Sequence, residues 1–192
     1  MVSRRRVMKI GAATVAGALV NRPVPGRNPA PAYSAFQRAV FDERFAQCRA
    51  FAAELNSAGV LTSAIRGDVA ELWYGDLRAL MSGNRLAVAG LTDRVSLFCL
   101  EELARDVGMR VIFRAEHIID REQDGHARHS AVGSASLVVV ARSLPPEDDF
   151  GLAMARLFRR FDLSEARDSA AQKRTGPFSP KNKTALVSWI IA

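Results

Sequence analysis

The sequence contains none of the short fingerprints that mark the common catalytic classes. It has no GxGxxG dinucleotide turn, no phosphate-binding loop, no GxSxG nucleophile elbow and no HExxH zinc helix. Only two cysteines and three histidines occur in 192 residues, which excludes a disulfide-stapled scaffold and a cysteine-rich metal domain. No uncharged apolar run reaches the roughly 20 residues of a transmembrane helix, so we expect no permanent membrane span.

Acidic residues are absent from residues 1–32, which hold six arginines and lysines. Arg4 and Arg5 belong to the stretch SRRRVMK, and the uncharged, mildly apolar run from Ile10 to Val20 follows. This layout is typical of a cleavable export signal, with cleavage expected after the A-x-A arrangement that ends at Ala32. The stretch resembles the twin-arginine (Tat) signal, in which Ser or Thr, two arginines, any residue, an apolar pair and Lys follow one another. The alternative is an ordinary basic N-terminus before an uncleaved anchor.

Removal of this segment changes the meaning of the chain's charge. The full sequence carries 27 basic and 20 acidic residues, a net charge of +7. Without the six basic residues of the signal, 21 basic residues remain against 20 acidic ones. A net charge near +1 gives no electrostatic footprint for nucleic acid, so we expect no nucleic-acid partner. The rest of the chain suits a single domain, which we place at 33–192.

Segments of strand and helix period alternate along this domain. Such alternation is typical of a mostly parallel sheet with helices on both faces, because a parallel crossover needs a helix. The fourth and fifth strands follow each other without a helix, so we expect an antiparallel pair. The prediction is a three-layer α/β sandwich of the flavodoxin-like kind with about six strands. Strands are expected at 38–42, 61–65, 86–90, 109–119, 135–141 and 184–191. Helices are expected at 43–57, 69–81 and 150–161. A further helix begins after a cap at Thr92 and Asp93 and stops at Gly108.

Both cysteines fall inside apolar helical patterns. Cys48 lies on the apolar face of the first helix, and Cys99 shares a helical period with Val95, Phe98 and Leu103. An oxidising compartment permits a disulfide. A free cysteine on an apolar face, however, behaves as a small buried hydrophobe. We therefore favour two buried thiols over one bridge.

The carboxyl ends of the first three strands carry the first candidate site. In open parallel sheets, ligands bind outside these ends, where the strand order reverses. Asp42 and Asp68 are the candidate general bases, while an arginine and Thr92 would hold an anionic group. The alternative is that Asp68 and Thr92 only cap helices and that Asp42 accepts hydrogen bonds in a turn. The candidate ligand-binding residues are Arg44, Arg66, Gly67, Gly90 and Thr92.

The second candidate site is the stretch EHIIDREQDGHARHS, which holds all three histidines, His117, His126 and His129. Imidazole binds Zn, Cu or Ni, so this cluster is a candidate metal site. The spacing matches no strong zinc template, and a polar, solvated connection between two strands is the favoured alternative. The neighbouring oxygen ligands would be Glu116, Asp120, Glu122 and Asp124.

Four stretches together carry a family resemblance: AVFDERFAQCRAFAAELNSAG, AIRGDVAELWYGDLRAL, VAGLTDRVSLFCLEELARDVGMRVIF and TALVSWII. They make most of the domain similar to an uncharacterised family of bacterial proteins with twin-arginine signals. The resemblance implies export and a single domain. It implies no activity, cofactor or catalytic residue.

Two functions remain open for the exported chain. In the first, it is a periplasmic ligand-binding or accessory protein that folds before export through the twin-arginine machinery, alongside a co-exported redox partner. In the second, it is a small periplasmic enzyme that uses acid/base chemistry on a small molecule, with Asp42 or Asp68 as base. The absence of a catalytic motif favours the first.

Overall fold

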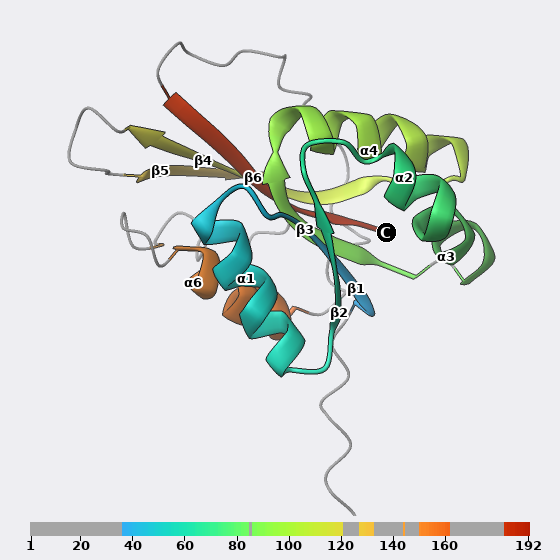
Figure 1. Ribbon diagram of the computed structural model, residues 1–192, viewed down its shortest axis with the longest axis horizontal. Coiled ribbons are helices and arrows are strands. Elements are labelled where there is room, and N and C mark those ends of the chain that lie inside the picture. Colours follow the sequence, from blue (N-terminus) through green and yellow to red (C-terminus); the bar gives the residue numbers. More distant parts are fainter. Residues whose placement is uncertain (1–35, 85, 121–126, 133–143, 145–149, 162–182) are drawn as a thin grey trace, which may run out of the picture. The chain divides into compact units, whose positions relative to one another are not determined.

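A six-stranded sheet forms the centre of the structure, a computed structural model (Figure 1). The model describes residues 36–84, 86–120, 127–132, 144, 150–161 and 183–192, which all belong to one compact unit, Pro31–Ala192. The strands are β1 (Arg38–Asp42), β2 (Leu61–Ile65), β3 (Val88–Asp93), β4 (Val111–Asp120), β5 (Ala127–Val132) and β6 (Lys183–Ile191). The helices are α1 (Ala46–Ser57), α2 (Ala70–Leu72), the π-helical turn η1 (Trp73–Leu77), α3 (Arg78–Asn84), α4 (Arg94–Asp106) and α6 (Phe150–Arg159).

The strand order is β2-β1-β3-β6-β4-β5. Strand β1 pairs in parallel with both β2 and β3, whereas β6 runs antiparallel to its neighbours β3 and β4. The pairing of β4 with β5 is antiparallel, as the sequence predicts. Four of the six strands therefore share one direction, and the predicted α/β class is confirmed. A flavodoxin-like sheet would place β4 beside β3, but here the C-terminal strand β6 lies between them.

Helices cover both faces of the sheet, giving the predicted three layers (Figure 1). On one face, α1 and α6 pack together over a core that includes Phe51, Phe113 and Phe158. The ring of Phe158 meets the other two edge-on, at centroid distances of 5.7 and 5.5 Å. A Cβ atom at Gly151 of α6 would lie only 2.0 Å from the backbone oxygen of Gln47. The two helices are thus in backbone contact, which only glycine permits.

The other face is covered by α4 and by the continuous run of α2, η1 and α3. In that run the buried residues are Val69, Trp73, Leu77 and Met81, each four positions after the last. A regular α-helix has 3.6 residues per turn, so a four-residue spacing drifts around its surface. The π-helical turn at Trp73–Leu77 has a wider turn and keeps the row on one face. The sequence predicts a plain helix at 69–81 and misses this turn.

Two strands differ from their predicted positions. Strand β3 continues to Asp93, so Thr92 is a strand residue and Asp93 alone caps α4, accepting a 2.7 Å hydrogen bond from the Ser96 backbone N–H. Strand β5 occupies Ala127–Val132, where the sequence suggests a connection, because pairing with β4 extends the ladder through a polar stretch. The predicted strand at 135–141 lies outside the described residues.

The buried face of α4 is not the predicted one. Val95 and Phe98 are 66% and 55% exposed, and Cys99 is exposed as well. The expectation of two buried thiols is therefore wrong for Cys99, whereas Cys48 is buried; both are free. Two apolar rows run along this helix, and the one that packs on the sheet includes a serine, which disguises it in the sequence. Its members are Ser96, Leu97, Leu100 and Ala104.

Two ion pairs fix the rotation of α4 above β4. Arg94 Nη2 lies 2.9 Å from Glu116 Oε1, and Arg114 Nη2 lies 2.5 Å from Glu101 Oε2. All four side chains are largely buried, so the pairs are better shielded from solvent than ordinary surface pairs. They lie on the side of the helix that carries the buried Leu97 row, and the Phe98 row lies on the exposed side.

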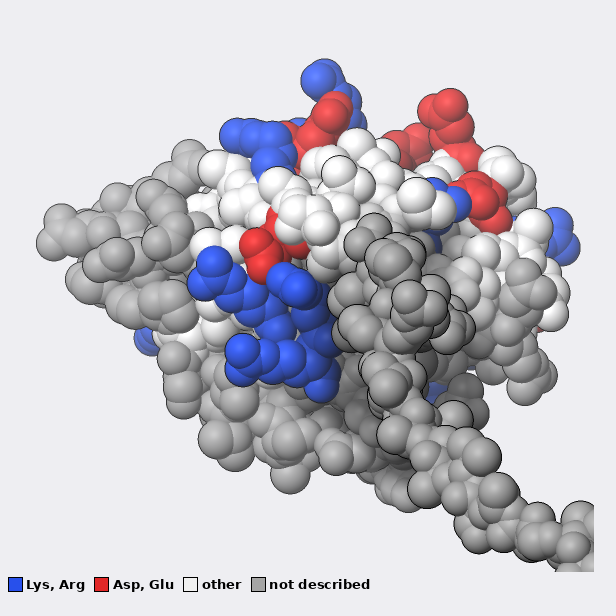
Figure 2. Space-filling model, turned by 90° about the horizontal axis from the view of Figure 1, so that it is seen from below, with Lys and Arg blue, Asp and Glu red and all other residues white. Residues whose placement is uncertain are grey.

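Basic side chains gather on the face of the molecule seen from below, with acidic side chains beside them (Figure 2). At the end of α6, Arg156 and Arg159 lie 3.6 and 2.9 Å from Glu54 of α1. These pairs link the two helices at their solvent side. The two arginines share this one carboxylate and remain largely exposed.

Candidate functional site

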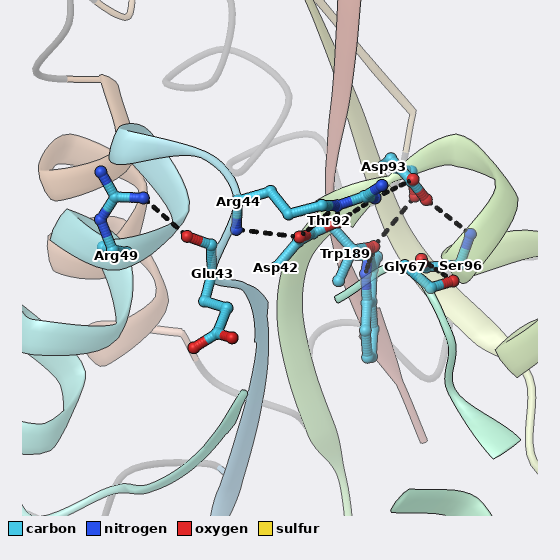
Figure 3. Close-up of polar contacts among 9 residues, drawn as sticks. All are labelled: Asp42, Glu43, Arg44, Arg49, Gly67, Thr92, Asp93, Ser96 and Trp189. Carbon is cyan, nitrogen blue, oxygen red and sulfur yellow. Dashed lines mark hydrogen bonds and ion pairs between the residues drawn. The ribbon is translucent and has the colours of Figure 1, made fainter. Parts of the chain in front are cut away.

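Arg44 joins the carboxyl ends of β1 and β3 (Figure 3). Its Nε donates to Asp42 Oδ1 at 2.9 Å, and its Nη2 donates to Asp42 Oδ2 at 2.5 Å. The same Nη2 donates to Asp93 Oδ2, also at 2.5 Å. The backbone N–H of Arg44 adds a 3.1 Å bond to Asp42 Oδ1. We refer to Asp42, Arg44 and Asp93 as the arginine clamp.

The clamp places one arginine between two carboxylates of unequal burial. Asp42 is fully buried, whereas the side chains of Arg44 and Asp93 are 44% and 23% exposed. A buried carboxylate needs a partner and hydrogen bonds to offset the loss of water, and Arg44 provides both. The hydrogen bond that Arg44 donates to Asp42 is the main reason that the pKa of Arg44 is raised above its usual range. The guanidinium is permanently charged, and the clamp carries a net charge of −1.

The clamp lies between β1 and β3, at the point where the strand order reverses. From β1 the chain passes through α1 to β2 on one side, and from β3 it passes through α4 toward β4 on the other. Folds of this kind bind ligands between such strands. Here the chain's own Arg44 occupies that position.

Gly67 is positioned under Arg44. Its φ of +86° lies in the left-handed region that favours glycine, and a Cβ atom would lie 2.8 Å from Arg44 Nη2. Its carbonyl oxygen accepts a 3.2 Å bond from Ser96 Oγ of α4. The turn after β2 thus packs against the clamp. The sequence predicts a ligand-binding role for Gly67, and the contact that the structure shows there is with the Arg44 side chain.

Trp189 lies beside two more of the predicted ligand-binding residues, Gly90 and Thr92. A Cβ atom at Gly90 would lie 2.2 Å from Trp189 Cζ2, so the indole lies flat on the glycine backbone. The indole Nε1 donates to Thr92 Oγ1 at 3.0 Å, and Thr92 Oγ1 donates to the backbone oxygen of Asp93 at 3.0 Å. Gly90 and Thr92 therefore serve the packing of Trp189 on β6.

Arg66 and Asp68 lie at the end of β2 and take no part in the clamp's hydrogen bonds. The side chain of Arg66 is 82% exposed and its Nε donates to Glu43 Oε1. Asp68 is exposed, and its Oδ1 accepts a 2.8 Å bond from the backbone N–H of Ala70 at the start of α2. The N-cap position of α2 is Val69, so Asp68 lies one residue before the position that the capping interpretation gives it, and its contact is a turn that leads into the helix.

Two of the three histidines of the second candidate site, His117 and His129, are described and lie in contact. His117 on β4 and His129 on β5 are directly opposite each other in the antiparallel ladder, and their Nδ1 atoms are 2.8 Å apart. His126 lies outside the described residues. Glu116 points to the other face of the sheet, toward Arg94. The interpretation of this region as a solvated connection is wrong for His117, which is fully buried and whose pKa is lowered by that burial and by His129.

Sequence reasoning misses three residues that hold these sites together: Asp93 in the clamp, Trp189 beside Thr92, and Ser188, whose Oγ lies 2.8 Å from His117 Nε2. Asp93 was assigned only as a helix cap, which it also is. Trp189 and Ser188 sit in a continuous apolar run, and only the insertion of β6 between β3 and β4 brings them to these sites. No pattern near Trp189 in the sequence indicates its neighbours.

Neither a family model, nor a curated protein, nor a solved structure matches the chain. Among the described residues, no helix is long and apolar enough to cross a membrane. The functional argument therefore rests on the sequence and on the geometry above.

Proposed function

We propose that this chain is an exported periplasmic protein that folds before export by the twin-arginine pathway and acts as an accessory protein to a co-exported partner. The observation that carries the choice of accessory protein over enzyme is the closed state of Asp42. Export itself is supported by the order of residues in SRRRVMK and the apolar run after it.

A general base must present a lone pair to its substrate at hydrogen-bond distance. Both oxygens of Asp42 accept hydrogen bonds from Arg44, and the side chain has no exposed surface. Proton abstraction by Asp42 would first require the clamp to open and leave a buried carboxylate without a partner, which is costly. The geometry thus favours a structural role for the clamp.

Binding of a small molecule is the second form of this proposal. Arg44 is held rigidly by two carboxylates and is still 44% exposed, and Arg66 is close by on the surface. A rigid arginine loses little freedom when it binds a carboxylate or phosphate. The net charge of −1 on the clamp opposes an anion, however, so this form has less support.

The enzyme alternative retains one supporting observation. Asp42 and Thr92 are both buried at the ends of neighbouring strands, and an arginine contacts Asp42. Chemistry at this point would use the pair of Asp42 and Arg44, because Asp68 is exposed and engaged in its own turn.

A ligand screen by thermal shift separates these functions. The full chain and its Arg44→Lys variant are incubated with a panel of small carboxylates, phosphates and amines, and compounds that raise Tm are re-isolated after prolonged incubation. For an accessory protein, we expect no compound whose effect depends on Arg44. A compound that stabilises only the wild type and returns unchanged would favour the ligand-binding form. Chemical conversion of such a compound, lost in Asp42→Asn, would establish the enzyme.

A further inference from the structure

The two imidazoles of His117 and His129 present the same ring nitrogen to a common point. They come from neighbouring antiparallel strands, and their Nδ1 atoms are 2.8 Å apart. The rings meet at 66° with centroids 5.0 Å apart. A proton on one Nδ1 satisfies the pair in the metal-free chain, since a neutral imidazole has one donor and one acceptor nitrogen.

The ring of His117 is fixed from two other directions. Its Nε2 lies 2.8 Å from Ser188 Oγ of β6, and Phe150 of α6 stacks on it at a centroid distance of 4.6 Å. A histidine that binds a metal commonly donates its second ring N–H to an oxygen, which fixes the tautomer. Ser188 Oγ can accept such a bond from Nε2, and this tautomer leaves a lone pair on Nδ1 that faces His129.

We infer that His117 and His129 bind a divalent transition-metal ion of the kind that prefers imidazole, such as Cu²⁺ or Zn²⁺, through their Nδ1 atoms. Both residues bind as neutral imidazoles: the proton shared between the Nδ1 atoms moves to Nε2 of His129, so no net proton is released. In the part of the chain that the structure describes, no third His, Cys, Asp or Glu completes a cluster.

Metal binding requires the two imidazoles both to separate and to turn, because Nδ1 lone pairs that share a proton point at each other and not at a third atom. Metal–nitrogen bonds of about 2.0–2.1 Å in a tetrahedral site hold two nitrogens about 3.3 Å apart. The Nδ1 atoms must therefore separate by about 0.5 Å from the metal-free distance. His129 is partly exposed on β5, which is the edge strand of the sheet, and its side chain can rotate while His117 stays fixed.

The test is a titration of the chelator-treated full chain with Cu²⁺ and, separately, Zn²⁺. We expect one Cu²⁺ per chain and an electron paramagnetic resonance spectrum with coupling to two imidazole nitrogens. His129→Gln should weaken binding at least tenfold and leave at most one coupled histidine nitrogen from this pair. Ser188→Ala should weaken binding by about 10 to 100-fold with the stoichiometry unchanged, which is the usual effect of removing a second hydrogen-bond partner.

Glu116→Gln is the matched control, because Glu116 neighbours His117 on β4 but points to the opposite face and pairs with Arg94. It should retain wild-type affinity. Substoichiometric binding by the wild type would overturn the inference, and so would a His129→Gln variant with wild-type affinity and spectrum. Near-ultraviolet circular dichroism of each variant confirms that a loss of binding is not a loss of fold.

Discussion

At the scale of single residues, two contacts near the clamp require the absence of a side chain. Gly67 and Gly90 lie against Arg44 and Trp189, at distances that no Cβ atom can share. Gly67 has a positive φ, so its backbone conformation also favours glycine. Gly90 has no such φ, and only the Trp189 indole leaves no room for a side chain there. Close packing within the chain is enough to explain why both positions are glycine. Their anion-binding role stays a prediction.

Gly90→Ala should lower the free energy of unfolding by about 1–3 kcal/mol, because the new methyl group would overlap the Trp189 ring in a packed core. Gly83→Ala is the matched control. Gly83 is exposed in α3 with open space around it, so alanine should stabilise the chain by about 0.5–1 kcal/mol. Urea unfolding measures both, and equal effects at the two positions would show that Trp189 does not lie on Gly90.

Arg44→Ala should cost roughly 2–4 kcal/mol, because it leaves the buried Asp42 carboxylate without its partner. Asp42→Asn in the same chain should recover part of this loss, since it removes the unpaired charge. Arg66→Ala, which breaks an exposed ion pair, should change stability by less than about 0.5 kcal/mol. A loss of similar size for Arg44→Ala and Arg66→Ala in urea unfolding would contradict the clamp.

The two cysteines should differ sharply in reactivity. Burial raises the pKa of the Cys48 thiol above its ordinary value, whereas Cys99 is exposed on α4. In the folded chain a maleimide should therefore modify Cys99 alone. Raising the pH to about 9 should not make Cys48 reactive, because only the thiolate reacts and the raised pKa keeps Cys48 protonated. Peptide mass mapping identifies the modified residue. Equal labelling of Cys48 before unfolding would be inconsistent with its position on the buried face of α1.

At the scale of elements, the faces of α4 show what sequence patterns can and cannot decide. The helix has two apolar rows, and periodicity alone does not choose between them. The buried row is the one that contacts distant parts of the chain, and the pairs Arg94–Glu116 and Glu101–Arg114 join the same side of the helix to β4. The helix itself, its Asp93 cap and its stop at Gly108 are predictable, because capping oxygens and a glycine with φ of +77° act locally.

Leu100→Ala should cost about 2–5 kcal/mol, the usual effect of removing a fully buried leucine side chain. Phe98→Ala, on the exposed side of the same helix, should change stability by less than about 1 kcal/mol. More than half of the surface of Phe98 is already exposed in the folded chain. The sequence pattern predicts the reverse order. Thermal and urea unfolding of the two variants decide which row faces the sheet.

The strand boundaries show the same division between local and distant causes. The ends of β1 and β2 follow from apolar strand runs and from turn residues beside them, and they match the prediction. The extension of β3 to Asp93 depends on pairing with β6, which lies far away in sequence, whereas β5 forms in a polar stretch by pairing with the preceding strand β4. For the same reason the clamp was only half predictable: Asp42 and Arg44 are neighbours in the chain, whereas Asp93 reaches them through the sheet.

At the scale of the whole molecule, the insertion of β6 between β3 and β4 determines both sites. It brings Trp189 to the end of β3 on one face and Ser188 to His117 on the other. A continuous apolar run correctly predicts a strand buried on both faces. It does not predict the position of that strand in the sheet, because several arrangements bury it equally well.

We propose that the chain is a folded cargo of the twin-arginine pathway. The direct test of this proposal is the distribution of the chain between cytoplasm and periplasm. The full chain is expressed in a bacterium with this pathway, beside an Arg4→Lys/Arg5→Lys variant. We predict that the wild type accumulates in the periplasm as a shortened chain and that the twin-lysine variant stays in the cytoplasm at full length. Equal periplasmic amounts of the two chains would contradict the account.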